Sequence, residues 1–142
     1  MLTQISEFAV NHPYLVMAFV VLLALVFFNE MKIATQRFAS LTPAAAVQLM
    51  NKEDVVVLDV REPSETIGGK IAKAIQSPAS AIAKRVGELE KFKDKTLLVY
   101  CKSGARAGIA CKELSKSGFD KVYSLNGGLL AWQDAHLPVS KK

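Results

Sequence analysis

The sequence is poor in residues that bind metal ions or cross-link a chain. Its 142 residues include only two cysteines, Cys101 and Cys111, and two histidines, His12 and His136. The cysteines do not form a CxxC pair and the histidines are remote from them along the chain, so we predict no metal site and no cofactor. A structural disulfide is not expected in a reducing compartment. Each thiol therefore needs its own explanation.

Charged residues are absent from one long stretch. Between Phe8 and Asn29 the 22 residues include no Asp, Glu, Lys or Arg. As a helix this stretch rises about 33 Å, compared with about 30 Å for the hydrocarbon core of a bilayer. It lacks a GxxxG pattern and a central ionisable residue, which argues against a channel, and it lacks the basic start of a signal peptide. We therefore predict a transmembrane helix over 8–29.

The residues on either side of this stretch set its predicted orientation. The residues before it carry only Glu7 as a charge, whereas Lys32 and Arg37 follow it. Positively charged flanks stay on the cytoplasmic side of a membrane. We therefore expect 1–7 to be a short extracytoplasmic tail, 30–40 to be a juxtamembrane linker, and the rest of the chain to lie in the cytoplasm.

The net positive charge comes from residues 41–142. These residues hold 16 Lys and Arg and 11 Asp and Glu, a difference of 5 that equals the net charge of the whole chain, +5. The lysines are dispersed and are not interleaved with aromatic residues, so we predict no nucleic-acid partner. A basic domain held beside a membrane is instead attracted to anionic lipid.

Residues 41–139 alternate between strand and helix patterns. Short β-branched and aliphatic runs predict buried strands at 54–60, 96–101 and 121–125. Helical patterns follow Thr42 and Pro43, cover 79–92 and 105–118, and return after Gly128. This alternation predicts an α/β domain with a mostly parallel sheet, and the terminal residues 140–142 are predicted to be disordered.

Cys101 lies at the carboxyl end of a predicted strand, where parallel sheets bind their ligands. Residues 102–104 then turn the chain into a helix that starts near Ala105. Such a loop directs backbone N–H groups and the helix dipole at one point, and Lys102 and Arg106 add positive charge. From these residues alone Cys101 is either a nucleophile with a stabilised thiolate or a small buried thiol at the end of a strand.

Three separated motifs resemble those of the rhodanese family, which are single-domain sulfurtransferases. "CKSGAR" at 101–106 is similar to the C-x4-R active-site loop of that family, "VLDVREPSE" at 57–65 to the segment after its first core strand, and "LNGGLLAWQDAHLP" at 125–138 to its closing signature. The chain looks most like the membrane-anchored YibN-type group. The resemblance implies a rhodanese-like three-layer domain over 41–139, after one transmembrane helix in the inner membrane of a bacterium.

The resemblance also implies what the loop does. Cys101 would take sulfane sulfur from a small donor such as thiosulfate, hold it as a persulfide, and pass it to a thiol or to cyanide. The backbone amides of the following residues would cradle the persulfide, and Arg106 would anchor the loop and help to receive an anionic donor. The predicted cradle consists of Lys102, Ser103, Gly104, Ala105 and Arg106.

Further residues are predicted to support the loop. We expect Asp59 and Arg61 to form an ion pair that holds the loops together rather than to contact substrate. Gly127 and Gly128 are expected to allow close backbone approach beside the cysteine, and Cys111 to lie in the core.

Other positions are given structural roles or depart from the family pattern. We expect His136 to end a helix, with positive φ, and not to act as a base. Thr66 replaces a common aromatic residue of the family, and Lys70 replaces a common histidine.

Two other functions are weighed against sulfur transfer. Cysteine phosphatases use C-x5-R and typically place a histidine before the nucleophile, whereas here four residues separate Cys101 from Arg106 and Tyr100 precedes the cysteine. A rhodanese-like fold can also serve without turnover, as a module that docks on membrane protein complexes. The presence of both Cys101 and Arg106 favours the enzyme, and the anchor suits either use.

Overall fold

The computed structural model describes residues 1–34 and 38–141. The chain divides into two compact units, Met1–Gln36 and Arg37–Lys142. The first unit contains helices and the second an α/β domain, and each is described by itself.

The first unit contains two helices, α1 (Leu2–Asn11) and α2 (Pro13–Ala34). They are separated at His12, which has φ −130° and ψ 58°, because a residue before proline is kept out of the helical conformation. The apolar stretch 8–29 is therefore not one helix, and most of the predicted tail 1–7 is helical.

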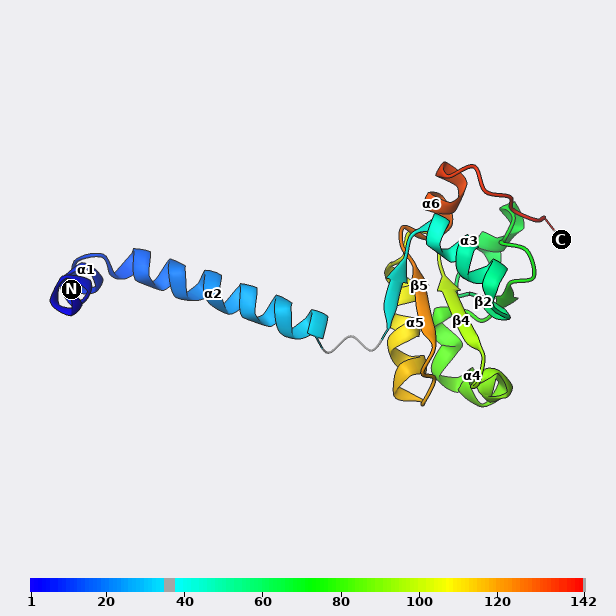
Figure 1. Cartoon of the computed structure of the whole chain (residues 1–142), viewed down its shortest axis with the longest axis horizontal. Helices are drawn as coiled ribbons and strands as arrows, with labels where there is room; N and C mark the ends of the chain where they lie inside the picture. Colours follow the sequence, from blue (N-terminus) through cyan, green and yellow to red (C-terminus); the bar gives the residue numbers. More distant parts are fainter. Residues whose placement is uncertain (35–37, 142) are drawn as a thin grey trace. The chain divides into compact units, whose positions relative to one another are not determined.

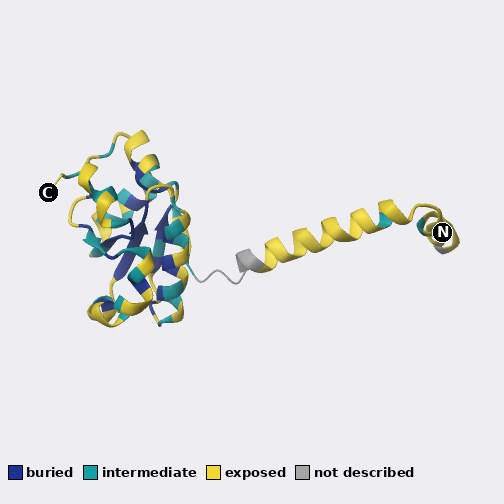
Figure 2. Cartoon of the chain, turned by 180° about the vertical axis from the view of Figure 1, so that it is seen from behind, coloured by how far each residue is buried: buried dark blue, intermediate teal, exposed yellow. Residues whose placement is uncertain are grey.

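Within α2, Pro13–Met31 is long and apolar enough to cross a membrane, with a mean hydropathy of 2.2. None of this span is buried inside the structure, and Figure 2 shows most of it as exposed.

The second unit is built on a five-stranded sheet whose strands pair in parallel, in the order β1-β5-β4-β2-β3 (Figure 1). The strands are β1 (Ala39–Leu41), β2 (Val55–Asp59), β3 (Ile75–Gln76), β4 (Thr96–Tyr100) and β5 (Val122–Leu125). β2 and β4 form from mainly apolar runs, which suit strands buried on both faces, whereas β5 includes Ser124. The predicted parallel sheet is confirmed.

Helices cover both faces of the sheet. The α-helices are α3 (Pro43–Lys52), α4 (Ile82–Leu89), α5 (Ala105–Lys116) and α6 (Gly128–Asp134), and the 3₁₀ helices are η1 (Pro63–Gly68), η2 (Ala79–Ala81) and η3 (Glu90–Phe92). One core cluster joins the sheet to α4 and α5, and a second joins it to α3 and α6. The predicted three-layer domain is therefore confirmed, and the central strands appear buried in Figure 2.

The alternation of side chains along β4 decides which core each residue enters. Leu97 and Val99 belong to the cluster on the α4 and α5 side, and Leu98 and Tyr100 to the cluster on the α3 and α6 side. Cys101 continues the first series. The cysteine and the tyrosine next to it in sequence therefore serve opposite faces of the sheet.

The sequence does not predict β1 and β3, which have only three and two residues. The predicted linker 30–40 divides between the end of α2 and β1, while 35–37, including Arg37, lie outside the described residues. The helix predicted over 79–92 is α4 with a 3₁₀ turn at each end. Strands this short are formed by pairing with neighbours rather than by their own apolar period.

The predicted disordered tail is wrong at Ser140. Its backbone N–H donates to the carbonyl oxygen of Lys70 at 2.7 Å, and the N–H of Lys70 donates back to Ser140 at 2.8 Å. Residue 142 lies outside the described residues. An antiparallel bridge therefore ties the end of the domain to the segment in which Lys70 departs from the family pattern.

Candidate active site

The carboxyl ends of β2, β4 and β5 bring the predicted site residues to one edge of the sheet. Asp59 ends β2, Cys101 follows β4, and Gly127 lies two residues after β5. Parallel neighbouring strands end at the same edge, which is the edge where α/β proteins place their ligands. Site residues that are as far apart in the sequence as Asp59 and Gly128 therefore lie at the same edge of the sheet.

The Cys101 side chain is held by the start of α5. Its residue is 0% exposed, and its Sγ accepts a hydrogen bond from the N–H of Gly104 at 3.0 Å. Gly104 has φ 104° and caps α5, a conformation that glycine adopts without strain. The first turn of a helix leaves its N–H groups without partners inside the helix, and the helix dipole is positive there. The start of α5 therefore places a backbone donor and positive partial charge beside Sγ.

The start of α6 fixes the backbone of the cysteine loop. The N–H of Leu129 donates to the carbonyl oxygen of Cys101 at 2.8 Å, and the N–H of Leu130 donates to that of Lys102 at 3.1 Å. A Cβ on Gly128 would lie 2.5 Å from the Cys101 oxygen, so this contact needs glycine. The close backbone approach predicted here is confirmed, and the same chain segment supplies partners for two carbonyl groups of the loop.

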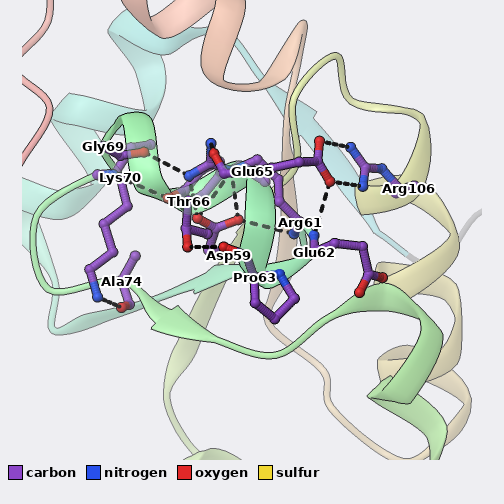
Figure 3. A network of polar contacts seen from close by, with 12 residues as sticks. Asp59, Arg61, Glu62, Pro63, Glu65, Thr66, Gly69, Lys70, Ala74 and Arg106 are labelled. Carbon is purple, nitrogen blue, oxygen red and sulfur yellow. Dashed lines mark hydrogen bonds and ion pairs between the residues drawn. The ribbon is translucent and has the colours of Figure 1, made fainter. Parts of the chain in front are cut away.

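A buried polar network consists of Asp59, Arg61 and Tyr100 (Figure 3 labels the first two). Arg61 Nη2 lies 2.7 Å from Asp59 Oδ2, and Arg61 Nε donates to Asp59 Oδ1 at 3.0 Å. Tyr100 Oη donates to Asp59 Oδ2 at 2.8 Å. Burial, together with the neighbouring carboxylate, raises the pKa of Tyr100 above its ordinary value. The predicted Asp59–Arg61 ion pair is confirmed.

Arg61 also fastens the segment that follows β2. Its Nη1 donates to the carbonyl oxygen of Glu65 at 2.9 Å, and its Nη2 donates to that of Gly69 at 2.8 Å. Because the guanidinium is buried and charged, each of these bonds offsets part of the cost of removing it from water. Arg61 therefore positions η1 rather than facing solvent.

Arg106 forms a fork with Glu65, a residue that the sequence analysis does not select. Arg106 Nη1 lies 2.6 Å from Glu65 Oε2, and Nη2 lies 2.7 Å from Oε1 (Figure 3). The fork and a hydrogen bond from the Glu62 N–H lower the pKa of Glu65 to about 2, and the fork raises the pKa of Arg106. Glu65 is the last residue of the motif "VLDVREPSE", but the sequence does not indicate its partner, because Arg106 is 41 residues away.

The remaining predicted residues occupy different environments. Lys102, Ser103 and Ala105 are exposed on the loop. Cys111 is buried in α5, and burial, with the nearby Cys101 charge, raises the pKa of its thiol to about 12. His136 has φ 55° just after α6, as predicted. Among residues 1–34 and 38–141, no group of three His, Cys, Asp or Glu side chains could hold a metal ion.

Comparison with known proteins identifies the family and the fold. Residues 42–135 match the family model described as "Rhodanese-like domain". The chain belongs to the rhodanese-like family. Within it, the chain is 36% identical over 137 residues to the Escherichia coli K12 protein named "Uncharacterized protein YibN", and the match covers 96% of each chain.

Two further relatives of this rhodanese-like chain were compared. It is 39% identical over 92 residues to a protein of Allochromatium vinosum named "Sulfurtransferase", which covers 65% of this chain and 84% of that one. A rhodanese-related protein from Thermoplasma volcanium superposes with a TM-score of 0.67 at 32% identity, covering 74% of this chain and 100% of the other. The family and its sulfurtransferase member support a sulfurtransferase-type function.

Proposed function

We propose that this rhodanese-like chain is a membrane-anchored sulfurtransferase that carries sulfane sulfur on Cys101. The observation that carries the proposal is the hydrogen bond from the Gly104 N–H to Cys101 Sγ, 3.0 Å long, at the start of α5. A backbone donor and a helix start aimed at a thiol stabilise its thiolate, which is the nucleophilic form. A cysteine that only filled the core would need neither.

In the first half-reaction the Cys101 thiolate attacks the outer sulfur of a thiosulfate-type donor. A bond forms between Sγ and that sulfur, the sulfur–sulfur bond of the donor breaks, and sulfite leaves with the electron pair. In the second half-reaction a thiolate or cyanide attacks the outer sulfur of the persulfide, and the electron pair of the broken bond returns to Sγ. No further oxidant or reductant is needed, and the protein is regenerated by a ping-pong cycle.

The cradle of the persulfide consists of backbone groups and one exposed cation. The Gly104 N–H donates to Sγ, and the other amides of 102–106 are proposed to hold the outer sulfur, since those in the first turn of α5 have no acceptor inside the helix. Lys102 is exposed on the same loop and supplies positive charge at its entrance. An anionic donor is therefore attracted to the loop, and the outer sulfur of the persulfide is held as an anion.

We test sulfur uptake by intact-mass analysis of the full-length protein in detergent after incubation with thiosulfate. Wild type and Cys111→Ala should each gain the mass of one sulfur atom, and Cys101→Ser should gain nothing. Subsequent addition of cyanide should remove the added mass. A wild type that gains no sulfur, or a Cys101→Ser variant that gains as much, would overturn the proposal.

The anchor is proposed to be α2, with the amino terminus outside the cytoplasm and the domain inside. Its apolar span and the Lys32 that follows it support this arrangement. Protease added to intact cells should leave the domain whole, and opening the cells should expose it to digestion. Digestion of the domain from outside the intact cells would contradict this orientation.

A further inference from the structure

We propose that Glu65 is a positioning residue that makes Arg106 a clamp on the cysteine loop, so that Arg106 does not itself receive the donor anion. The kinetic part of this inference rests on the proposed sulfurtransferase function. It keeps the anchoring of the loop that the family resemblance implies for Arg106, adds Glu65 as the partner that does the anchoring, and removes the donor-binding role that the resemblance also implies.

Arg106 already uses both of its terminal nitrogens. Nη1 and Nη2 contact the two carboxylate oxygens of Glu65 at 2.6 and 2.7 Å. A planar guanidinium presents this fork to one carboxylate or oxyanion at a time. A donor that took this place would leave the Glu65 carboxylate unpaired beside a second anion, which is unfavourable.

Glu65 is in turn fixed to the core, so it can hold Arg106 in place. Its Oε2 also accepts the N–H of Glu62 at 3.0 Å, and its backbone oxygen accepts Arg61 Nη1 at 2.9 Å. The Arg61 side chain is only 4% exposed and is paired with Asp59. A continuous series of hydrogen bonds therefore runs from the buried end of β2 to the first turn of α5 (Figure 3).

The position of Arg106 explains how the ion pair with Glu65 restrains the cysteine loop. Arg106 is the second residue of α5, whose cap, Gly104, donates to Cys101 Sγ. Holding the Arg106 side chain restrains the helix turn that carries this donor. Lys102, exposed and without an ion pair among the described residues, is then the loop cation that meets the donor.

We test this with single-turnover sulfur uptake from thiosulfate by the full-length protein, which separates the maximal rate from the half-saturating concentration. Glu65→Gln and Arg106→Gln should each lower the maximal rate about tenfold or more and change half-saturation less than about threefold. The double variant should be no more than about twofold slower than either single one, since both break the same pair. Lys102→Ala should instead raise the half-saturating concentration.

The matched control is Glu88→Gln, which breaks the exposed Arg85–Glu88 pair (2.9 Å) elsewhere on the domain and should leave uptake unchanged. If Arg106→Gln raises half-saturation about tenfold while the maximal rate holds, Arg106 receives the donor and the inference is wrong. Rate losses that multiply in the double variant also contradict it, because Glu65 would then act apart from Arg106.

Hydrogen exchange of the amides in 102–106, measured without donor, separates this inference from the proposed function. Exchange should be faster in Glu65→Gln and Arg106→Gln than in wild type and Glu88→Gln, while β4 stays protected. If wild type takes up no sulfur but the loop exchanges faster in both variants, the sulfurtransferase proposal fails and the clamp stands. If sulfur is taken up and exchange is unchanged in both variants, the clamp fails alone.

Discussion

Two polar regions at the same edge of the sheet differ in whether their polar groups have partners inside the protein. The buried network of Asp59, Arg61 and Tyr100 pairs its charged groups with one another and with backbone carbonyls. The cysteine loop, 101–106, instead leaves Lys102 and Ser103 exposed beside a buried sulfur. A network whose members hydrogen-bond to one another stabilises the fold, whereas a loop whose N–H donors have no protein acceptor can bind a ligand.

Arg61 of the buried network and Arg106 of the cysteine loop differ in the same way. Arg61 has a side chain that is 4% exposed, and Arg106 one that is 36% exposed. Loss of a partner leaves Arg61 as an unpaired buried charge, but leaves Arg106 in contact with water. We therefore expect damage to the buried network to reduce stability and damage to the loop to reduce sulfur transfer.

The largest expected effect separates the two cysteines, both of which are fully buried. Cys101→Ser should reduce sulfur transfer from thiosulfate to cyanide to the rate without protein, because it removes the nucleophile. Cys111→Ala should keep transfer within about twofold, since Cys111 lies in the core and its pKa is about 12. Steady-state thiocyanate formation measures both. Sulfur transfer by Cys101→Ser, or loss of sulfur transfer in Cys111→Ala, would contradict the different roles given to the two cysteines.

The next largest effect concerns the buried network. Asp59→Asn removes the charge partner of a buried arginine and should lower the free energy of unfolding by about 3–5 kcal/mol. The matched control is Asp54→Asn, which breaks an exposed pair with Lys95 (2.6 Å) and should cost about 0–1 kcal/mol. Urea unfolding at pH 7 measures both variants. Equal losses would show that burial does not distinguish these pairs.

A smaller effect is expected at the contact that joins α6 to the loop. Gly128→Ala places a Cβ 2.5 Å from the Cys101 oxygen and at φ 60°, and should cost about 1–3 kcal/mol while slowing transfer. Gly87→Ala in α4 has no atom within 4 Å of the new Cβ and should stabilise the protein by about 0.5–1 kcal/mol. Thermal unfolding and transfer rates measure both, and a Gly128→Ala variant with normal transfer contradicts the account.

The smallest effect is a dependence on acid. Arg106, with help from the Glu62 N–H, holds the pKa of folded Glu65 at about 2, compared with about 4.3 in an unfolded chain. The stability from this depressed pKa is fully present above the unfolded value and is lost as pH falls through the folded value. The advantage of wild type over Glu65→Gln in urea should therefore narrow from about pH 4.5 to pH 2. A gap that stays constant over this range contradicts the pairing.

Much of the fold can be predicted from the sequence because its central strands are mainly apolar. β2, β4 and β5 lie within the predicted ranges, and Cys101 follows a strand and precedes a helix as expected. β1 and β3 could not be predicted, since they depend on pairing with β5 and β2. Pro13 is a local signal for the helix break at His12. The prediction of one helix over 8–29 rested on the absence of charged residues and did not use this signal.

Two kinds of contact in the site could be predicted: the ion pair between sequence neighbours, and the approach of Gly128 to the backbone of Cys101. Asp59 and Arg61 lie two positions apart, so their ion pair is visible in the sequence. Glu65 and Arg106 are separated by 41 positions and meet only because β2 and β4 are adjacent in the sheet. No local pattern indicates that the loop arginine already has a carboxylate partner.

The most direct test of the central claim is the release of sulfite when the full-length protein is mixed with excess thiosulfate in the absence of an acceptor. If Cys101 holds sulfur as a persulfide, wild type should release a burst of one sulfite per chain and then stop, as should Cys111→Ala. Addition of cyanide should restart release, and Cys101→Ser should show no burst. An absent burst in wild type, or an equal burst in Cys101→Ser, would contradict the account.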